Sequence, residues 1–540
     1  MSNTSTVPNT PRGFVIERGD GQAKLPGSLH VNRKISQWLD FSTPGLVRVH
    51  TGKVELGQGI LTALQIIAAD ELQLPLTQIE MVSASTLHGP DEGMTSGSLS
   101  VQDSGSAIRQ ACAEVRRLTG LQGGDYWGAL KGVSLDFEPT DLAPTLSPEQ
   151  RQFSGRIKSR RLDLPAKILG QARFIHDMRP EGLVHGRVLR LPSPQAQLLS
   201  NADALQSAIS PEVQCVVRGR FVGVLAEHEW QAQKALDQLS QAARWEEPDT
   251  LPDMHQLEGF LRQAEAETQV TSRRGLGGPE DGNIFQSTYL KPYLAHASIG
   301  LCCALAQFDG QHLEVWTHSQ GIHNLRDDLV RALADGPHPL SKSQMTLHHV
   351  EGAGCYGHNG ADDVAFDAVL LALERPGAVV RVLWTREQEL ANAPLGSAHL
   401  VDLKASLSAD GQIERAGLQR TLDLRRWQRH GLHRRPRCLS RHRLDDAGQE
   451  HHLAHVRQGN RKQVRGGGRI ERARLQNALL YAGQHIPCGG NERQRTRCRF
   501  HAARGAHEQR VIEHRTQLGQ RRAHARLAHA ELLCGHAHAA

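Results

Sequence analysis

A recurrent pairing of a loop with a helix constrains the fold of this 540-residue chain more than any other feature of its sequence. In four places a loop of glycine, small hydroxyl residues or glutamine directly precedes a helix with an apolar stripe, and a strand-like run comes before three of these loops. The four stretches are residues 52–72, 92–118, 316–333 and 348–374. The alternation predicts a mixed helix-and-sheet fold with loops at helix N-termini, where free N–H groups suit an anion.

The first stretch, GKVELGQGILTALQIIAADEL, lies between the strand-like run LVRVHT and Pro75, which ends the helix. Its apolar residues at helical spacing are Leu61, Leu64, Ala68 and Leu72. Gly57, Gln58 and Gly59 therefore form the turn from strand to helix, where glycine lets a ligand approach the backbone. A plain structural turn carries equal weight, because short glycine motifs are weak signals.

The other loops differ in chemistry. Ser and Thr residues precede the second helix, Gln320 lies in the third loop, and GAGCYGHNG forms the fourth. The second helix has a stripe that is expected to be buried, with Ser104 or Ser106 as its cap; the stripe is Ile108, Ala111, Cys112 and Val115. Four such loops, with glutamine in two turns and few lysines, indicate a large ligand with phosphates and many hydrogen-bonding edges.

The fourth loop also permits a different interpretation. Gly352, Gly354 and Gly357 match the dinucleotide fingerprint Gly-x-Gly-x-x-Gly between a strand and a helix. Against it, three further residues lengthen the loop, and Asp362 and Asp363 would repel a pyrophosphate at the helix start. An NAD(P)-binding dehydrogenase therefore stays an alternative.

The charge of the chain is divided unevenly. Residues 425–540 contain 24 Arg, 14 His and one Lys against eight acidic residues, whereas the rest of the chain is acidic. Apolar periodicity also weakens in this region. An Arg- and His-rich, Lys-poor sequence of this kind is typical of a GC-rich gene translated in the wrong reading frame. A frameshift is the favoured hypothesis, and an Arg-rich arm that binds nucleic acid or anionic surfaces is the alternative.

Cysteine usage and hydropathy exclude several classes. The nine cysteines form no Cys-x-x-Cys pair, which argues against a disulfide framework, a zinc site or an iron–sulfur site on this chain. No apolar run approaches the roughly 20 residues that span a bilayer. The N-terminus has neither an apolar signal core nor a twin arginine, so it reads as a disordered lead-in of a cytoplasmic protein.

Six ordered stretches resemble the large, molybdenum-binding subunit of the xanthine dehydrogenase/aldehyde oxidase superfamily. They are GKVELGQGILTALQIIAADEL, DEGMTSGSLSVQDSGSAIRQAC, RLDLPAKILGQARFIHDMRPEGLVHGRVLRLP, YLKPYLAHAS, WTHSQG and EGAGCYGHNGADD. Their order is most similar to the branch of bacterial nicotinate dehydrogenase and isoquinoline 1-oxidoreductase β-subunits, because the Gly-Gln-Gly segment comes first. The resemblance spans residues 30–423.

This resemblance implies an α+β fold, the molybdenum-hydroxylase large-subunit fold with an α/β hammerhead-like domain, incomplete at the C-terminus. The expected parts are a disordered lead-in (1–29), a molybdopterin-binding segment (30–120), a linker (121–165), the hammerhead-like domain (166–246), a second linker (247–283), a molybdopterin-binding domain (284–423) and an Arg/His-rich region that is frameshifted or disordered (424–540).

The implied activity is oxidative hydroxylation of an N-heteroaromatic substrate, nicotinate- or isoquinoline-like, or of an aldehyde, with water as the oxygen source. The implied cofactor is molybdopterin cytosine dinucleotide. The implied partners are a small subunit with [2Fe–2S] clusters and a cytochrome or another electron acceptor, without a membrane or nucleic acid. The family's catalytic glutamate lies in a C-terminal Gly-x-Gly-Glu sequence that this chain lacks, so no catalytic residue is assigned and activity of the chain as written stays open.

The resemblance also implies cofactor-binding residues. Gln320 matches the glutamine near the molybdenum oxo ligand, and Gly57, Gln58 and Gly59 match a pterin-binding turn. A loop that hydrogen-bonds the cofactor is matched by Ser96, Gly97, Ser98, Leu99 and Ser100. A Gly-Phe-Gly loop whose backbone approaches the metal is matched by Gly354, Cys355, Tyr356 and Gly357.

Two departures limit this transfer. Cys355 and Tyr356 depart from the Gly-Phe-Gly loop of the family, and core packing is the alternative role for Tyr356. His296, in YLAHAS, is expected to have a structural role. No residue of this chain is expected to ligate the metal.

Overall fold

The computed structural model describes residues 24–139, 142–155, 161–193, 195–248, 253–264, 283–357, 362–393, 395–410 and 413–422. The chain divides into two compact units, Met1–His452 and Leu453–Ala540, and every described residue belongs to the first. The Arg/His-rich region 424–540 and most of the expected lead-in lie outside the described residues. Leu25 and Leu29, at the end of that lead-in, are buried.

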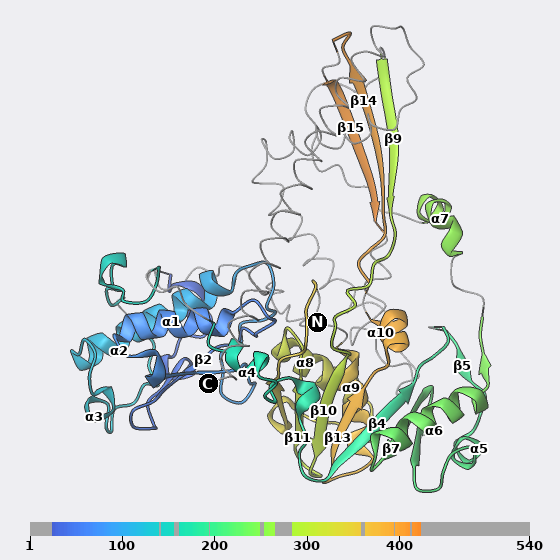
Figure 1. The fold of residues 1–540 in the computed structure, drawn as a ribbon, viewed down its shortest axis with the longest axis horizontal. Coiled ribbons are helices and arrows are strands. Elements are labelled where there is room, and N and C mark those ends of the chain that lie inside the picture. The colour runs from blue at the N-terminus through green and yellow to red at the C-terminus, as the bar shows by residue number, and fades with distance from the viewer. Residues whose placement is uncertain are drawn as a thin grey trace, which may run out of the picture. The chain divides into compact units, whose positions relative to one another are not determined.

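The first part of the fold is a small sheet with two helices (Figure 1). Its strands are β1 (Leu39–Asp40), β2 (Val47–His50) and β3 (Ile79–Val82), with β2 central, antiparallel to β1 and parallel to β3. Helix α1 (Ile60–Leu72) connects β2 to β3 and packs against α2 (Ser106–Thr119). The stripe predicted for α2 is fully buried, so both predicted helices are confirmed.

Short helical turns complete this part of the chain. The 3₁₀ turns are η1 (Gly27–His30), η2 (Ile35–Gln37), η3 (Leu76–Gln78), η5 (Pro148–Gln150) and η6 (Ile175–Asp177). A π-helical turn, η4 (Val101–Gly105), leads directly into α2. Two short α-helices follow, α3 (Tyr126–Ala129) and α4 (Leu164–Ile168). The expected serine cap of α2 is wrong, because the helical backbone already begins with η4 and neither serine caps it.

A seven-stranded sheet forms the centre of the described chain. Its order is β12-β11-β10-β13-β4-β7-β6. The bounds are β4 (Leu183–Leu189), β6 (Gln214–Arg218), β7 (Phe221–Ala226), β10 (Cys303–Phe308), β11 (Leu313–Thr317), β12 (Met345–His349) and β13 (Val379–Leu383). Only the pairs β11–β12 and β13–β4 are parallel. Since β4 pairs with β13, the sheet continues from the 166–246 segment into the 284–423 segment.

This order does not fit a dinucleotide-binding fold. Helix α9 (Asp363–Leu373) connects β12 to β13, but β11 and β10 lie between those two strands. The fingerprint requires a parallel β-α-β unit within a parallel sheet, whereas β10 is antiparallel to both of its neighbours. The glycines of the 352–357 loop therefore have a different structural setting.

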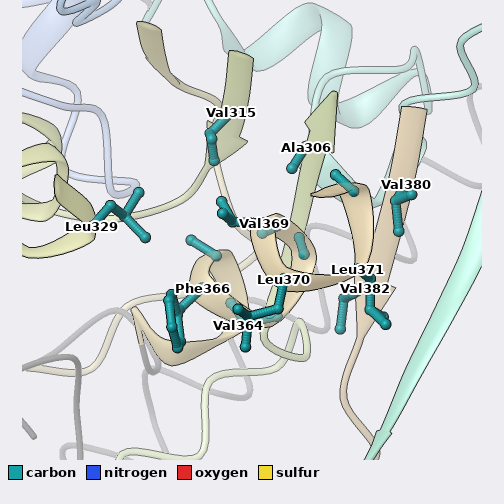
Figure 2. Packing of buried hydrophobic residues seen from close by; sticks show 14 of the residues in the cluster. Ala306, Val315, Leu329, Val364, Phe366, Val369, Leu370, Leu371, Val380 and Val382 are labelled. Carbon is teal, nitrogen blue, oxygen red and sulfur yellow. The ribbon is translucent and has the colours of Figure 1, made fainter. Parts of the chain in front are cut away.

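Helix α9 is the apolar centre of the sheet's core. Every residue from Val364 to Leu373 is buried, and the helix contacts β10, β11 and β13. Figure 2 shows Val369, Leu370 and Leu371 among the side chains of the sheet. The other helices of this region are α5 (Ala202–Ser207), α6 (Glu229–Ala242), α8 (Ile322–Leu333) and α10 (Arg386–Asn392).

The remaining strands form two further sheets. An antiparallel sheet has the order β15-β14-β9, with β9 (Asn283–Lys291), β14 (His399–Leu407) and β15 (Ile413–Leu422). The other is the pair β5 (Gln197–Leu198) and β8 (Trp245–Glu246), and η7 (Met254–Gln256) precedes α7 (Leu257–Gln263). The mixture of helices with separate sheets confirms the α+β class. Within the described residues, no helix has the length and apolarity to cross a bilayer.

Residues 83–86 connect the first part of the fold to the edge strand β12. The His349 N–H donates to the Ala84 carbonyl over 2.8 Å, and the Thr86 N–H donates to the Leu347 carbonyl over 2.9 Å. The Ser83 hydroxyl lies 3.1 Å from His349 Nδ1. The segment thereby pairs with the otherwise open edge of the seven-stranded sheet.

Substituting Gly186 tests the packing of α9 on this sheet. A Cβ there would lie 2.7 Å from Leu371 Cδ1 and 3.0 Å from Val382 Cγ2. We expect Gly186→Ala to lower the free energy of unfolding by about 1–3 kcal/mol through overpacking. Gly259→Ala is the control, because nothing lies within 4 Å of its Cβ position in α7. Equal stability of the two variants in urea unfolding would contradict this packing.

The His349 imidazole gives the join between 83–86 and β12 a pH dependence. Burial lowers the pKa of His349 to about 3, so below its ordinary pKa of about 6.5 the unfolded chain binds a proton that the folded chain does not. The contribution of neutral His349 to stability is therefore present above pH 6.5 and lost as the pH falls toward 3. Between pH 6.5 and 5 we expect a loss of about 2 kcal/mol. His349→Gln should show a shallower decline, and an identical pH profile would contradict the assignment.

Candidate functional site

Gln320 lies in the turn between β11 and α8, where the sequence analysis placed it. Its backbone carbonyl accepts from the Thr95 N–H over 2.8 Å, and its Nε2 donates to the Thr95 carbonyl over 2.9 Å. Both residues are buried. This reciprocal pair attaches the 96–100 loop to the end of β11, although more than 200 residues separate them in sequence.

Thr95 also connects the 57–59 turn to this pair. The Val54 N–H donates to Thr95 Oγ1 over 3.0 Å, and Gln58 Nε2 donates to the Val54 carbonyl over 2.9 Å. Three of the four predicted loops therefore meet around one threonine. Thr95 has no distinguishing signal in the sequence, since a threonine beside serines in a loop gives no indication of burial.

The 57–59 turn has the backbone that its glycines suggested. Gly57 and Gly59 have φ of +100° and +80°, a left-handed conformation that favours glycine. Among the described residues other than its two chain neighbours, none has an atom within 4 Å of a Cβ built on Gly57. Both ends of the Gln58 side-chain amide are bonded to the preceding main chain: Oε1 accepts from the Leu56 N–H, and Nε2 donates to the Val54 carbonyl. The pterin-binding role of Gln58 stays a prediction.

The expectation of free N–H groups at this helix start is wrong for Gly59 and Leu61. The Glu55 carboxylate accepts from the N–H groups of Gly57 over 2.9 Å, Gly59 over 2.8 Å and Leu61 over 3.3 Å. An anion is favoured at a helix N-terminus, and the chain supplies its own from two residues before the turn. Glu55 is 2% exposed, so it occupies this position as a buried group.

The 96–100 loop is more open. Ser96, Gly97 and Ser98 are exposed, whereas Leu99 and Ser100 are half-buried. Gly97 and Ser98 have φ of +70° and +59°. Among the described residues beyond its chain neighbours, only Leu99 comes near a Cβ on Gly97, at 3.7 Å. The exposed backbone and hydroxyls fit phosphate and heterocycle groups, which need many short-range donors.

A hydrogen bond between Glu92 and Ser104 connects the two segments that flank this loop in sequence. The Ser104 hydroxyl donates to Glu92 Oε2 over 3.0 Å, and the Gly52 N–H donates to the same oxygen over 2.8 Å. Thr51 Oγ1 lies 3.0 Å from that oxygen as well. Ser104, one of the two serines expected to cap α2, therefore connects the segments on either side of the 96–100 loop instead.

The 352–357 loop follows β12. Gly354 and Gly357 have φ of +94° and +133°. The Gly300 N–H donates to the Ala353 carbonyl over 2.7 Å, and a Cβ on Gly357 would lie 3.0 Å from His296 Cδ2. The loop thus packs against the end of the YLAHAS stretch, and the structural role of His296 stays a prediction.

Cys355 and Tyr356, the two residues that depart from the family pattern, differ in their exposure. Tyr356 is 58% exposed, which excludes the core-packing alternative for its ring. Cys355 is half-buried, and burial raises the pKa of its thiol.

Strand geometry brings the fourth loop to the same edge as Gln320. β11 and β12 are parallel neighbours, and the Val350 N–H donates to the Thr317 carbonyl over 3.0 Å. Loops that follow the carboxyl ends of adjacent parallel strands form the usual binding edge of such sheets. In the part of the chain that the structure describes, no three His, Cys, Asp or Glu side chains group to hold a metal ion.

Comparisons with known proteins match both parts of this site. Two molybdopterin cofactor-binding domain models match residues 21–123 and 280–432. A subunit of nicotinate dehydrogenase from Pseudomonas putida is 35% identical over 424 residues, which are 71% of this chain and 34% of that protein. Aldehyde oxidase 3 from Rattus norvegicus is 39% identical over 74 residues, 14% of this chain and 6% of the relative.

Solved structures give weaker similarity. Quinoline 2-oxidoreductase from Pseudomonas putida 86 has a TM-score of 0.39 at 16% identity, with 48% of this chain and 38% of the other covered. Aldehyde oxidoreductase from Desulfovibrio desulfuricans has a TM-score of 0.38 at 15% identity, covering 59% and 38%. The chain spans about a third of the length of the nicotinate dehydrogenase polypeptide that it matches.

Truncating Glu55 tests the 57–59 turn. Glu55→Ala leaves three N–H groups without their acceptor, so we expect the free energy of unfolding to fall by about 2–4 kcal/mol. Glu55→Gln keeps one acceptor oxygen and should lose less. Glu80→Ala is the control, since Glu80 is half-exposed and pairs only with Arg48 among the ion pairs described, and its loss should stay below about 1 kcal/mol. Equal losses for the two alanine variants would contradict the role of Glu55.

Proposed function

This chain belongs to the xanthine dehydrogenase/aldehyde oxidase superfamily, and on that premise we propose that it is the cofactor-binding body of a molybdenum hydroxylase. The observation that carries the proposal is the meeting of the matched loops at Thr95, which joins the 57–59 turn, the 96–100 loop and Gln320. These loops come from the two regions that match molybdopterin cofactor-binding domains.

The donor set fits a molybdopterin ligand. The exposed backbone and hydroxyls of Ser96, Gly97 and Ser98 would hold phosphate or nucleotide groups, and the open face of Gly57 would admit the flat edge of a pterin. Gln320 would orient groups near the metal through the turn that Thr95 fixes. When bound, the cofactor supplies the two-electron redox chemistry that these side chains lack.

The substrate class follows from the relatives. Similarity to a nicotinate dehydrogenase polypeptide over most of this chain supports an N-heteroaromatic substrate, hydroxylated with oxygen from water. Aldehydes are the second candidate, because the aldehyde oxidase match is confined to a short stretch. The cytosine dinucleotide form of the cofactor, a [2Fe–2S] partner subunit, a cytochrome or other acceptor and a cytoplasmic location are parts of the same proposal.

The alternatives have less support. The strand order around the 352–357 loop differs from a dinucleotide-binding unit, and the comparisons give no support for an NAD(P)-binding dehydrogenase. A nucleic-acid-binding role would depend on residues 424–540, which lie outside the described residues. No catalytic base is assigned, because the Gly-x-Gly-Glu sequence is absent.

Metal and nucleotide analysis of the full chain, co-expressed with a [2Fe–2S] subunit, tests the proposal. We expect near-stoichiometric molybdenum and a cytidine nucleotide. Absence of molybdenum, from a host that loads a related enzyme in parallel, would overturn the proposal for this chain.

A substitution in the 96–100 loop adds a second test to that experiment. Gly97→Ala should lower the amount of nucleotide bound per chain, because the new methyl group would occupy the open face of the loop. Gly45→Ala is matched to it, since Gly45 also has a positive φ, +78°, and open space at its Cβ position. Both variants carry a similar backbone strain of about 1–2 kcal/mol, so equal nucleotide contents would contradict the placement.

A further inference from the structure

We propose that a chain of alternating charges fixes the 57–59 turn relative to the 352–357 loop, so that both loops face one ligand. This ion-pair chain consists of Glu55, Arg161, Asp163, Lys167, Glu351 and Arg173. The inference deepens the proposed function, because that function makes a cofactor the common ligand of both loops. Four of its six residues, Arg161, Asp163, Lys167 and Arg173, come from residues 161–173, which lie between the two regions matched by the domain models.

Arg161 holds the first end of the ion-pair chain. Its Nη2 lies 3.5 Å from Glu55 Oε1, the oxygen that also accepts the Gly57 and Gly59 N–H groups. Arg161 Nη1 donates to the Gly57 carbonyl as well. A Cβ on Gly59 would lie 3.3 Å from Arg161 Cδ and Nε, so the glycine lets this side chain cross the turn closely. Arg161 therefore contacts both the carboxylate inside the turn and the backbone of the turn.

Asp163 connects Arg161 to Lys167. Arg161 Nε donates to Asp163 Oδ1 over 2.9 Å, and Lys167 Nζ lies 2.6 Å from Asp163 Oδ2. The hydrogen bond from Arg161 holds the pKa of Asp163 well below its ordinary range, so the carboxylate stays ionised between its two cations.

Glu351 forms the second end. Lys167 Nζ lies 2.6 Å from Glu351 Oε2, and Arg173 Nη2 lies 2.9 Å from Glu351 Oε1. The Glu351 carbonyl accepts from the Ile175 N–H over 2.8 Å. Because Glu351 directly precedes Gly352, side chain and backbone together fix the start of the 352–357 loop.

Burial makes this chain of charges a rigid connector. The side chains of Glu55, Asp163 and Glu351 are 2%, 8% and 10% exposed, and a buried carboxylate that loses its cation is strongly destabilised. Among the described residues, Lys167, 16% exposed, forms ion pairs with both Asp163 and Glu351. Removing its charge should therefore uncouple the two loops while each end keeps an arginine.

Hydrogen exchange on the full chain, without cofactor, tests this positioning role. In Lys167→Met we expect the amides of residues 55–61 and of 351–357 to exchange about tenfold faster or more, with helix α9 unchanged. Lys167→Arg should restore both loops. If Lys167→Met does not fold, Asp163→Asn, which removes one charge at constant shape, carries the same expectation.

The control is Lys342→Met, which removes a lysine from the more exposed pair with Asp327. It should leave both loops unchanged. Faster exchange at only one loop, or at neither, would overturn the inference, and so would failure of Lys167→Arg to restore them. Because exchange is measured without cofactor, this outcome is independent of whether the chain takes up molybdenum. In loaded preparations, lower nucleotide content in Lys167→Met than in Lys342→Met is the further expected result.

Discussion

The pairing of residues 83–86 with β12 is the contact on which the candidate site depends. It is made by backbone N–H and C=O groups, such as His349 with Ala84 and Thr86 with Leu347, so it satisfies an edge strand that would otherwise stay open. The pairing brings a segment just before the 96–100 loop to the side of the strand that leads into the 352–357 loop. Thr95, nine residues after this segment, and Gln320, which follows the neighbouring strand β11, then complete the attachment.

Buried carboxylates that accept backbone N–H groups recur through the first part of the fold. Asp70 accepts from three consecutive residues, 152–154, and Glu71 accepts from Leu146. Glu114 accepts from Ala143. These acids anchor residues 142–155, within the expected linker, onto α1 and α2, because a buried carboxylate is stable only when several donors surround it. Glu55 likewise accepts backbone N–H groups, from Gly57 and Gly59 of the 57–59 turn.

Local periodicity predicted the elements well and their pairing poorly. The stripe of α2 and the strand β2 follow from spacings within a few residues. The pairing of β4 with β13 joins residues about 200 positions apart, and no periodicity encodes it. At the candidate site, motif resemblance located the loops, but it could not show that Glu55 fills the first one or that Thr95 unites three of them, because both depend on burial.

The four loops therefore contribute unequally to the site. The N–H groups of Gly57 and Gly59 are taken by Glu55, whereas residues 96–98 are exposed. Ligand contacts at the first turn must then be made by its open glycine face, and contacts at the second by donors. The change to Cys355-Tyr356 leaves Gly354 and Gly357 in positive-φ conformations, which is the property that close backbone approach requires. Side-chain divergence at this loop is thus compatible with retention of its shape.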